Sequence, residues 1–370
     1  MKKKVLQVIG ALTIGGAETV AMNLFRYIDK NIYEFDYIVF GDKIGSCEEE
    51  MINIGAKIIH VNHPSSNHFM FCRQLDHIIK ENGPYDIVHS HTLLNSGFVM
   101  KIAAKNGVKC RVSHSHSIQS KVSSSLILRI YEKVMRYLII KYSTHYAACG
   151  IAAGNYLFGE KLFSRKGIII KNGIDAVKYK FNNNTRRIIR RELNISDNFV
   201  IGYVGHFAAV KNLDFLIDVF KQIHTLNPSS VLLLVGDGNE RIKLENKIKE
   251  FGLEANVIMT GNISNVNEML NAMDVFVFPS LYEGLGMALI EAQANGLPCI
   301  VSDTIPNDAF ITDLIKILSL NDTLELWADT IINTKRNNSN VYCEKIIKEG
   351  YDVSLIGTNI QVIYESKHHL

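Results

Sequence analysis

Short runs of apolar residues recur along the chain and alternate with longer segments whose apolar positions are spaced three and four apart. The short runs predict buried strands, and the longer segments predict amphipathic helices. In the first half we expect a helix at about 17–27 and strands at 5–9, 37–40, 57–61, 87–89, 109–113, 146–148 and 168–170. Because helices alternate with strands, this half is expected to form a parallel sheet that helices cover on both faces.

The same alternation restarts in the second half. Helices are expected at 213–224 and 240–251, and strands at 199–204, 231–235, 257–260, 275–278 and 299–302. A chain of 370 residues is longer than one hydrophobic core usually serves. We therefore expect two Rossmann-like α/β domains, at about 1–172 and 173–351. The asparagine runs at 182–184 and 337–340 are interpreted as surface loops or hinges, and the last segment, from about 352, as a helix.

Composition narrows the class of protein. Lys and Arg number 40 against 37 Asp and Glu, so there is no overall charge signature of a nucleic-acid-binding protein. The apolar runs are much shorter than a membrane-spanning helix, and the first residues do not resemble a signal peptide. Six cysteines are scattered without a C-x-x-C pair. A cytoplasmic protein with free thiols accounts for this best.

One stretch, FPSLYEGLGMALIEAQANGLP at 278–298, carries the most specific chemistry. It is expected to run from a strand through a glycine loop into a helix that Gly296 and Pro298 end. Gly284 and Gly286 allow the backbone to approach a ligand, and the start of a helix favours an anion. Glu283 and Glu291 beside such a site are expected to accept hydrogen bonds from hydroxyl groups. In isolation, the two acids could also be solvated helix residues.

This stretch resembles the E-x7-E signature of retaining glycosyltransferases with the GT-B fold, and most closely those of family four in bacterial exopolysaccharide and capsule synthesis. The resemblance implies two Rossmann-like domains facing a cleft, with the terminal helix (352–370) returning to the first domain. It implies that the first domain takes the acceptor and the second the nucleotide-sugar donor. A sugar, a hexose most simply, would pass from a nucleoside diphosphate, with UDP favoured, to a glycan or a lipid-linked saccharide.

The resemblance also implies roles for residues of the second half. Glu291 is expected to hold the ribose, while Glu283 and the Gly284–Met287 segment, including Leu285 and Gly286, bind the hydroxyls of the donor sugar. Lys211 is expected to stabilise the departing diphosphate. The family usually has an arginine where this chain has His206, and an imidazole offers a single donor instead of a permanently charged fork. The loops at Asp237 and at Gly261 and Asn262 could frame the base, or they could be plain turns.

Two motifs of the first half are candidates for the same substrate. The loop with Gly15 and Gly16, before Ala17 and Glu18, lets a diphosphate approach, although its glycines could merely allow the turn. Two H-x-H pairs are placed just past strands: His89 with His91, and His114 with His116. By resemblance His116, with His114 second, is the active-site histidine that contacts the donor sugar. For His89 and His91 a structural role is favoured, and a zinc site is disfavoured because no carboxylate or cysteine stands at ligand spacing.

No D-x-D motif occurs in the chain, so metal-independent transfer without a cofactor is expected. The segment 126–142 is helical in period and mixes basic with apolar residues, which would suit peripheral binding at the inner face of the cytoplasmic membrane. A core-facing helix with a solvated basic edge is the alternative. Two other functions share the predicted architecture: a nucleotide-sugar 2-epimerase, and a non-catalytic partner subunit that the His206 departure would permit.

Overall fold

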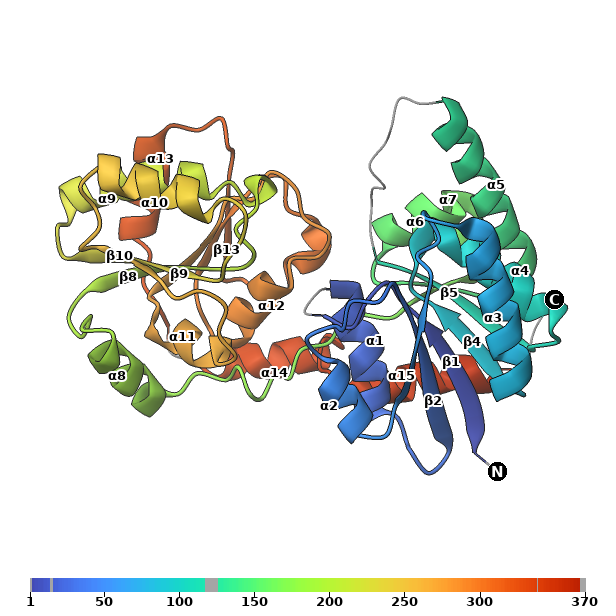
Figure 1. Cartoon of the computed structure of the whole chain (residues 1–370). Helices are drawn as coiled ribbons and strands as arrows, with labels where there is room; N and C mark the ends of the chain where they lie inside the picture. The colour runs from blue at the N-terminus through green and yellow to red at the C-terminus, as the bar shows by residue number, and fades with distance from the viewer. Residues whose placement is uncertain (1, 14–15, 117–125, 338, 367–370) are drawn as a thin grey trace. The chain divides into compact units, whose positions relative to one another are not determined.

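The computed structural model describes residues 2–13, 16–116, 126–337 and 339–366 (Figure 1). It divides into two compact units, Met1–Gly173 with Val353–Leu370, and Ile174–Asp352. These boundaries lie within one residue of those expected from the sequence. Each unit is described by itself below.

The first unit is a parallel sheet with helices on both faces. Its strands are ordered β3-β2-β1-β4-β5-β6-β7. They are β1 (Lys3–Val8), β2 (Tyr33–Phe40), β3 (Lys57–Val61), β4 (Ile87–Ser90), β5 (Cys110–Ser115), β6 (His145–Ala148) and β7 (Gly167–Ile169). Its helices are α1 (Gly16–Tyr27), α2 (Glu48–Asn53), α3 (His68–Asn82), α4 (Ser96–Lys105), α5 (Leu126–Tyr142), α6 (Ile151–Phe158), α7 (Glu160–Lys166) and α15 (Ser354–Glu365).

Alternate residues of the strands face different cores on the two sides of the sheet. In β1, Val5 faces the core under α1 and α15, whereas Leu6 and Val8 face the core under α3 and α4. The last helix, α15, packs beside α1 (Figure 1). A Cβ at Gly357 of α15 would lie 2.2 Å from the carbonyl oxygen of Tyr27, so only glycine allows this close approach. The C-terminal segment thus belongs to the first unit, as the sequence analysis expected.

The second unit repeats the design with six strands in the order β10-β9-β8-β11-β12-β13. The strands are β8 (Phe199–Val204), β9 (Ser230–Val235), β10 (Val257–Met259), β11 (Val275–Phe278), β12 (Cys299–Ser302) and β13 (Ile315–Leu318). The helices are α8 (Asn183–Glu192), α9 (Leu213–Leu226), α10 (Arg241–Glu250), α11 (Val266–Ala272), α12 (Met287–Ala294), α13 (Leu324–Ile332) and α14 (Val341–Lys348). All of the strand pairs in both sheets are parallel, which confirms the expected fold class.

The interpretation of the first asparagine run as a loop is wrong. Asn182 caps α8, because its side-chain oxygen accepts hydrogen bonds from the backbone N–H groups of Asn184 and Thr185. Asparagine is among the best N-cap residues, so a helix start explains the run better than a hinge does. The sequence analysis also left out β13, α13 and α14; of these, β13 is short and exposes two of its four residues.

Candidate functional site

Both sheets have a switch point, where the chain changes the direction in which it adds strands. In the first unit β1 lies between β2 and β4, and in the second β8 lies between β9 and β11. In open parallel sheets, ligands bind at the carboxyl ends of the strands beside such a point. The predicted site residues gather there in each unit: Gly16 and His91 follow β1 and β4, and Lys211 and Glu283 follow β8 and β11.

In the second unit, Lys211 and Glu283 form a buried ion pair. The Lys211 Nζ lies 2.5 Å from the Glu283 Oε1, and the Ser280 hydroxyl donates to the same oxygen at 2.8 Å. The two loops are joined by a hydrogen bond from the Leu281 N–H to the Val210 carbonyl oxygen at 2.8 Å. Glu283 is only 7% exposed, so the site needs a cation to hold its charge. Among the described hydrogen bonds none uses the Glu283 Oε2, which leaves this oxygen available to a hydroxyl group.

The glycine loop leads from Glu283 into α12. Gly286 caps the helix with φ +72°, and a Cβ there would lie 3.1 Å from the Phe278 ring, so this position requires glycine. Gly284 is different, because a Cβ there would meet nothing within 4 Å. Leu285 is buried and anchors the loop in the core. Met287 begins α12, whose first N–H groups face the loop as donors for an anion.

Glu291 lies on α12 and has a partner of its own. Its carboxyl group accepts a hydrogen bond from Tyr179, whose backbone carbonyl accepts one from the Asn295 side chain at 2.8 Å. Removal from water raises the pKa of Glu291 to about 7, although the Tyr179 hydrogen bond and the charge of Lys178 oppose the rise. Glu291 is thus poised between its neutral and charged forms near neutral pH, while Glu283 is held by Lys211.

The remaining predicted residues of this unit lie in neighbouring loops. His206 is exposed after β8, and the N–H of the next residue, Phe207, donates to the Asp237 carbonyl oxygen at 2.9 Å. The loops after β9 and β10 are tied by a hydrogen bond from Gly236 to Gly261 at 3.1 Å. Asn262 is exposed beside them. The Asp237 carboxylate pairs with Arg241 at 3.4 Å.

In the first unit, Gly16 is the first residue of α1, and Gly15 lies outside the described residues. A Cβ at Gly16 would meet nothing within 4 Å in the structure. The fold of the unit therefore does not itself require glycine at this position. The close approach of a ligand therefore remains as a reason for glycine at position 16.

The four histidines form one stacked cluster at the carboxyl ends of β4 and β5. The two pairs were expected just past strands, but His89 lies inside β4 and His114 inside β5, where the pleat turns both onto the face that α1 and α15 cover. The His89 Nε2 lies 3.2 Å from the His114 Nδ1, and the His91 Nδ1 lies 2.8 Å from the His116 Nε2. The rings of His114 and His116 are 4.0 Å apart.

Two residues that the sequence analysis did not select complete the cluster. The His91 Nε2 lies 2.8 Å from the Gln7 Oε1, and the His89 Nδ1 lies 2.9 Å from the Tyr364 hydroxyl. The Gln7 amide nitrogen donates to that hydroxyl at 3.2 Å. Gln7 was visible as a polar residue in an apolar strand, whereas no signal in the sequence connected Tyr364 with this site.

Burial keeps the cluster uncharged. Desolvation lowers the pKa of His116 to about 3 and holds the pKa values of His89, His91 and His114 well below the usual range, and mutual repulsion adds to the effect for these three. The structure thus places neutral imidazoles here, which act as hydrogen-bonding groups instead of a cationic patch.

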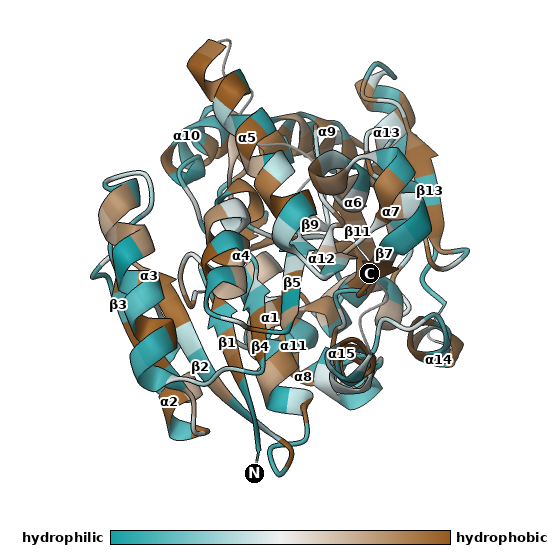
Figure 2. Cartoon of the chain, turned by 90° about the vertical axis from the view of Figure 1, so that its right-hand side faces the viewer, coloured by the Kyte–Doolittle hydropathy of each residue, from teal (hydrophilic) through white to brown (hydrophobic). Residues whose placement is uncertain are grey.

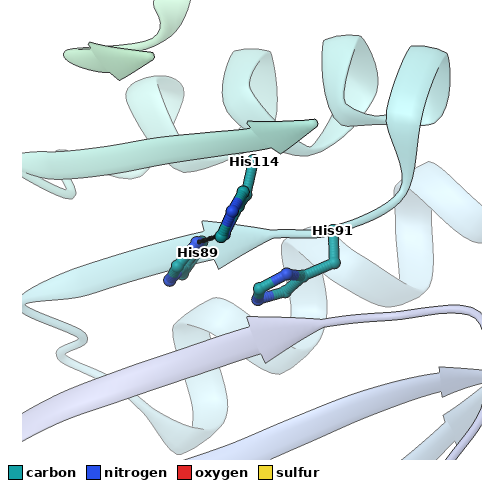
Figure 3. Close-up of side chains that lie close together, drawn as sticks. All are labelled: His89, His91 and His114. Atoms are coloured by element: carbon teal, nitrogen blue, oxygen red, sulfur yellow. Dashed lines mark hydrogen bonds between the residues drawn. The ribbon is translucent and has the colours of Figure 1, made fainter. Parts of the chain in front are cut away.

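Figure 3 shows His89, His91 and His114, whose nearest ring nitrogens lie within 4.8 Å of one another. Three such nitrogens could surround a transition metal ion. In this structure, however, both nitrogens of His89 and both of His91 take part in hydrogen bonds. A metal ion would have to break these hydrogen bonds, so the structure favours a hydrogen-bonded cluster over a metal site.

Two units, each with a parallel sheet and a candidate site at its switch point, define the class of proteins with two Rossmann-like domains. Residues 14–178 match the model of the family described as Glycosyltransferase Family 4, and residues 185–353 match that of Glycosyl transferases group 1. The chain belongs to the family four glycosyltransferases of the exopolysaccharide and capsule type, which have the GT-B fold.

Relatives and solved structures agree with this assignment. The chain is 36% identical to a putative glycosyltransferase, EpsF, of Bacillus subtilis, over 95% of this chain and 93% of that one. It is 28% identical to the capsular polysaccharide biosynthesis glycosyltransferase CapH of Staphylococcus aureus, over 98% and 99%. The structure of Anabaena HepE in complex with UDP superposes with a TM-score of 0.80 at 20% identity, over 98% of both chains.

Proposed function

We propose that this glycosyltransferase moves a sugar, with retention of its anomeric configuration, from a UDP-sugar to a saccharide acceptor in the synthesis of a cell-surface polysaccharide. The observation that carries the proposal is the Lys211–Glu283 pair beside the start of α12. Lys211 has three donors and uses one on Glu283, so two remain for the oxygens of a diphosphate. The Glu283 Oε2 can accept a sugar hydroxyl at the same time.

Two relatives support the choice of substrates. An Escherichia coli galactosyltransferase, 30% identical over 73% of this chain and 72% of that one, is named for UDP-Gal and a diphosphoundecaprenol acceptor. The HepE structures hold UDP and UDP-glucose. We extend a uridine donor and a saccharide or lipid-linked saccharide acceptor to this chain, with Glu291 and Tyr179 proposed to hold the ribose.

The transfer is proposed to be independent of metal ions and of any cofactor. Lys211 and the first N–H groups of α12 supply fixed positive charge where the leaving diphosphate gains negative charge. His206 in its protonated form adds a further donor at the end of β8. This arrangement gives the charge stabilisation that a divalent cation provides in other transferases.

A thermal-shift series tests the donor site. UDP at a hundredfold excess over its Kd should stabilise the protein by about 2.7 kcal/mol, and EDTA should not change the shift. Glu291→Ala should abolish the shift, while the control Glu250→Ala, which removes an exposed carboxylate of α10, should keep it. Retention and transfer are then read by NMR of the product anomer. No shift with any nucleotide would contradict the proposal, and an isomerised nucleotide sugar would identify an epimerase.

We also propose that α5 places the protein on the inner face of the cytoplasmic membrane. The later turns of α5 pack on the core through Met135 and Ile139, as the alternative of a core-facing helix expects, but its first turn, 126–130, is exposed throughout. Ile127, Ile130, Val134 and Tyr137 form an exposed apolar stripe, which is brown at the start of α5 in Figure 2. Arg129 and Lys133 are exposed beside it. None of the helices within the described residues is long and apolar enough to cross a membrane.

An amphipathic helix of this kind binds a bilayer through its apolar face and through its charge. The protein should therefore float with vesicles rich in anionic lipid and not with neutral ones. The double variant Ile127→Asp with Ile130→Asp should lose flotation, whereas Ile188→Asp, at an exposed apolar residue of α8, should retain it. Absence of co-flotation in the wild type would remove the membrane proposal and leave the transfer reaction untouched.

A further inference from the structure

The hydrogen bonds of the histidine cluster form a single path that begins and ends in a ring nitrogen without a partner. The path runs from His116 through His91 and Gln7 to Tyr364, and from there through His89 to His114. Its two ends, the His116 Nδ1 and the His114 Nε2, are buried and have no hydrogen-bond partner among the described residues. Buried polar atoms of this kind call for a ligand or an ordered water.

The Gln7 amide fixes where the protons of one half of the path lie. Its oxygen can only accept a hydrogen bond, so the His91 Nε2 carries the proton and donates it to this oxygen. The His91 Nδ1 is then unprotonated and offers a lone pair. That lone pair accepts from the His116 Nε2–H. Because His116 is neutral, its Nδ1 is then also a lone pair.

The other half follows from the amide nitrogen of Gln7, which can only donate. It donates to the Tyr364 oxygen, and the Tyr364 proton then goes to the His89 Nδ1. His89 therefore carries its proton on Nε2 and donates to the His114 Nδ1. The remaining proton of His114 is on Nε2, at the other end of the path.

We propose that Gln7 and Tyr364 are positioning residues that make His116 a hydrogen-bond acceptor and His114 a donor, so that the two together hold a hydroxyl group of the saccharide substrate. A hydroxyl both donates and accepts, and the two rings lie close enough, 4.0 Å between centres, to serve one group or two neighbouring ones. Since neither end carries a charge, this pair selects a neutral hydroxyl over a phosphate. The inference rests on the proposed function only for the identity of the hydroxyl.

A change at Gln7 tests the path at its centre. In Gln7→Glu both carboxylate oxygens accept, so Tyr364 would donate to Glu and no longer to the His89 Nδ1. His89 and His114 should then move their protons from Nε2 to Nδ1, while His91 and His116 keep theirs on Nε2. Long-range proton–nitrogen NMR of protein labelled with 15N-histidine distinguishes these forms directly. Unchanged protons on His89 and His114 would overturn the inference, as would charged rings or a ring-nitrogen shift caused by added Zn²⁺.

Tyr364→Phe provides the matched control, because it removes only the hydroxyl that couples the two halves. On this background Gln7→Glu should no longer affect His89 and His114. The single Tyr364→Phe variant should leave His91 and His116 unchanged and let His114 populate both proton positions. This single variant tests the path even if a carboxylate at position 7 prevents folding. A proton that stays on the His114 Nε2 would contradict the path.

Kinetic measurements on Gln7→Glu test whether the proton positions on His114 and His116 affect substrate binding. In Gln7→Glu two lone pairs face one hydroxyl and one of them is left unpaired, so kcat/KM should fall roughly tenfold or more. The affinity for UDP alone, which has no sugar to place there, should stay unchanged. A lower affinity for UDP-sugar relative to UDP would assign the hydroxyl to the donor, and a raised KM for the acceptor alone would assign it to the acceptor. Absence of UDP binding in the wild type would refute the proposed function but not the proton positions, whereas unchanged kinetics in an active variant would refute the inference.

Discussion

At the switch point of the first unit the polar groups are four neutral histidines tied to Gln7 and Tyr364, whereas the second unit has Lys211, two carboxyl groups and the start of a helix. The topology of the two sheets is the same at this point, with the loops of two central strands side by side. The difference lies in the charge that the side chains keep after burial. In the first unit desolvation removes the charge from every ring, and in the second an ion pair preserves it.

On the proposed function, the two units bind different chemical groups of the substrates. Neutral donors and acceptors discriminate among hydroxyl groups, while fixed charge stabilises a diphosphate, particularly when it leaves. A parallel sheet offers the same edge to either chemistry, so the function of each unit follows from its side chains and not from its architecture. The variants below are designed to remove one property at a time from one of the two sites.

Lys211→Met should have the largest effect. It removes a positive charge at the diphosphate, and the loss of one such preorganised group costs roughly 100-fold or more in kcat. UDP affinity should fall as well. Lys247→Met is the matched control, because Lys247 of α10 is similarly buried and pairs with Asp214 and Asp218 of α9 instead of Glu283.

The pair of variants separates catalysis from stability. Both leave a carboxylate without its cation, so both should lower the thermal midpoint, but only Lys211→Met should lower kcat/KM. Lys211→Arg should restore part of the activity, since it keeps the charge with a different geometry. Equal activity of the two Met variants would show that the charge of Lys211 is not used in transfer.

The sequence was sufficient for the fold, because strand and helix periods alternate cleanly from Val5 to Ser302 and central strands such as β9, β11 and β12 are buried throughout. It was not sufficient where a signal had two meanings, as at Asn182, whose side chain caps a helix but also suits a loop. The last strand, β13, escaped because it is short and its Ile317 is half-exposed.

The candidate site residues also fall into those that the sequence indicates and those that it does not. Lys211, Glu283 and Glu291 could be selected as candidates because they stand at fixed distances from glycines within short motifs. Gln7 and Tyr364 were not, because their contact joins residues 357 positions apart and depends on α15 docking beside α1. Periodicity places a residue on a face but does not say which distant side chain meets it, and the His89–Tyr364 bond is of that kind.

Glu291 should make stability depend on pH. Its pKa in the folded state, about 7, lies above the ordinary value of 4.5, so the folded state binds the proton more tightly. The stabilisation is fully present below about pH 4.5 and is lost as the pH rises through 7, with a limit of about 3 kcal/mol. Thermal midpoints of wild type and Glu291→Gln, at pH 5 and pH 8, measure it.

Glu291→Gln serves as the reference because an amide does not ionise. The midpoint of the wild type should fall relative to that of the variant between the two pH values. A constant difference would show that Glu291 keeps the same charge throughout. The first unit offers the contrast: burial lowers the pKa of its four histidines below that of histidine in the unfolded chain, so they raise stability as the pH rises, and they do so equally in both proteins.

His206 should give a smaller effect, on rate alone. If His206 binds the diphosphate, an arginine at this position should bind it better, because guanidinium offers a fork of donors and a permanent charge. We expect His206→Arg to exceed the wild type in kcat/KM by roughly tenfold. Equal kcat/KM of the two proteins would exclude His206 from diphosphate binding.

The two open glycines should give the smallest effect and the most direct comparison of the two switch points. A Cβ at Gly16 or Gly284 meets nothing within 4 Å, so alanine at either position should keep the thermal midpoint or raise it slightly. Gly286→Ala is the control that should lower the midpoint, because φ at Gly286 is +72° and alanine there should cost about 1–2 kcal/mol of the free energy of unfolding.

If these glycines serve to let a ligand approach, Gly284→Ala weakens UDP binding severalfold without loss of stability. If Gly16 serves the same diphosphate, its alanine variant does likewise; a purely local turn would instead leave UDP binding unchanged, and the first unit would then interact with the sugar alone.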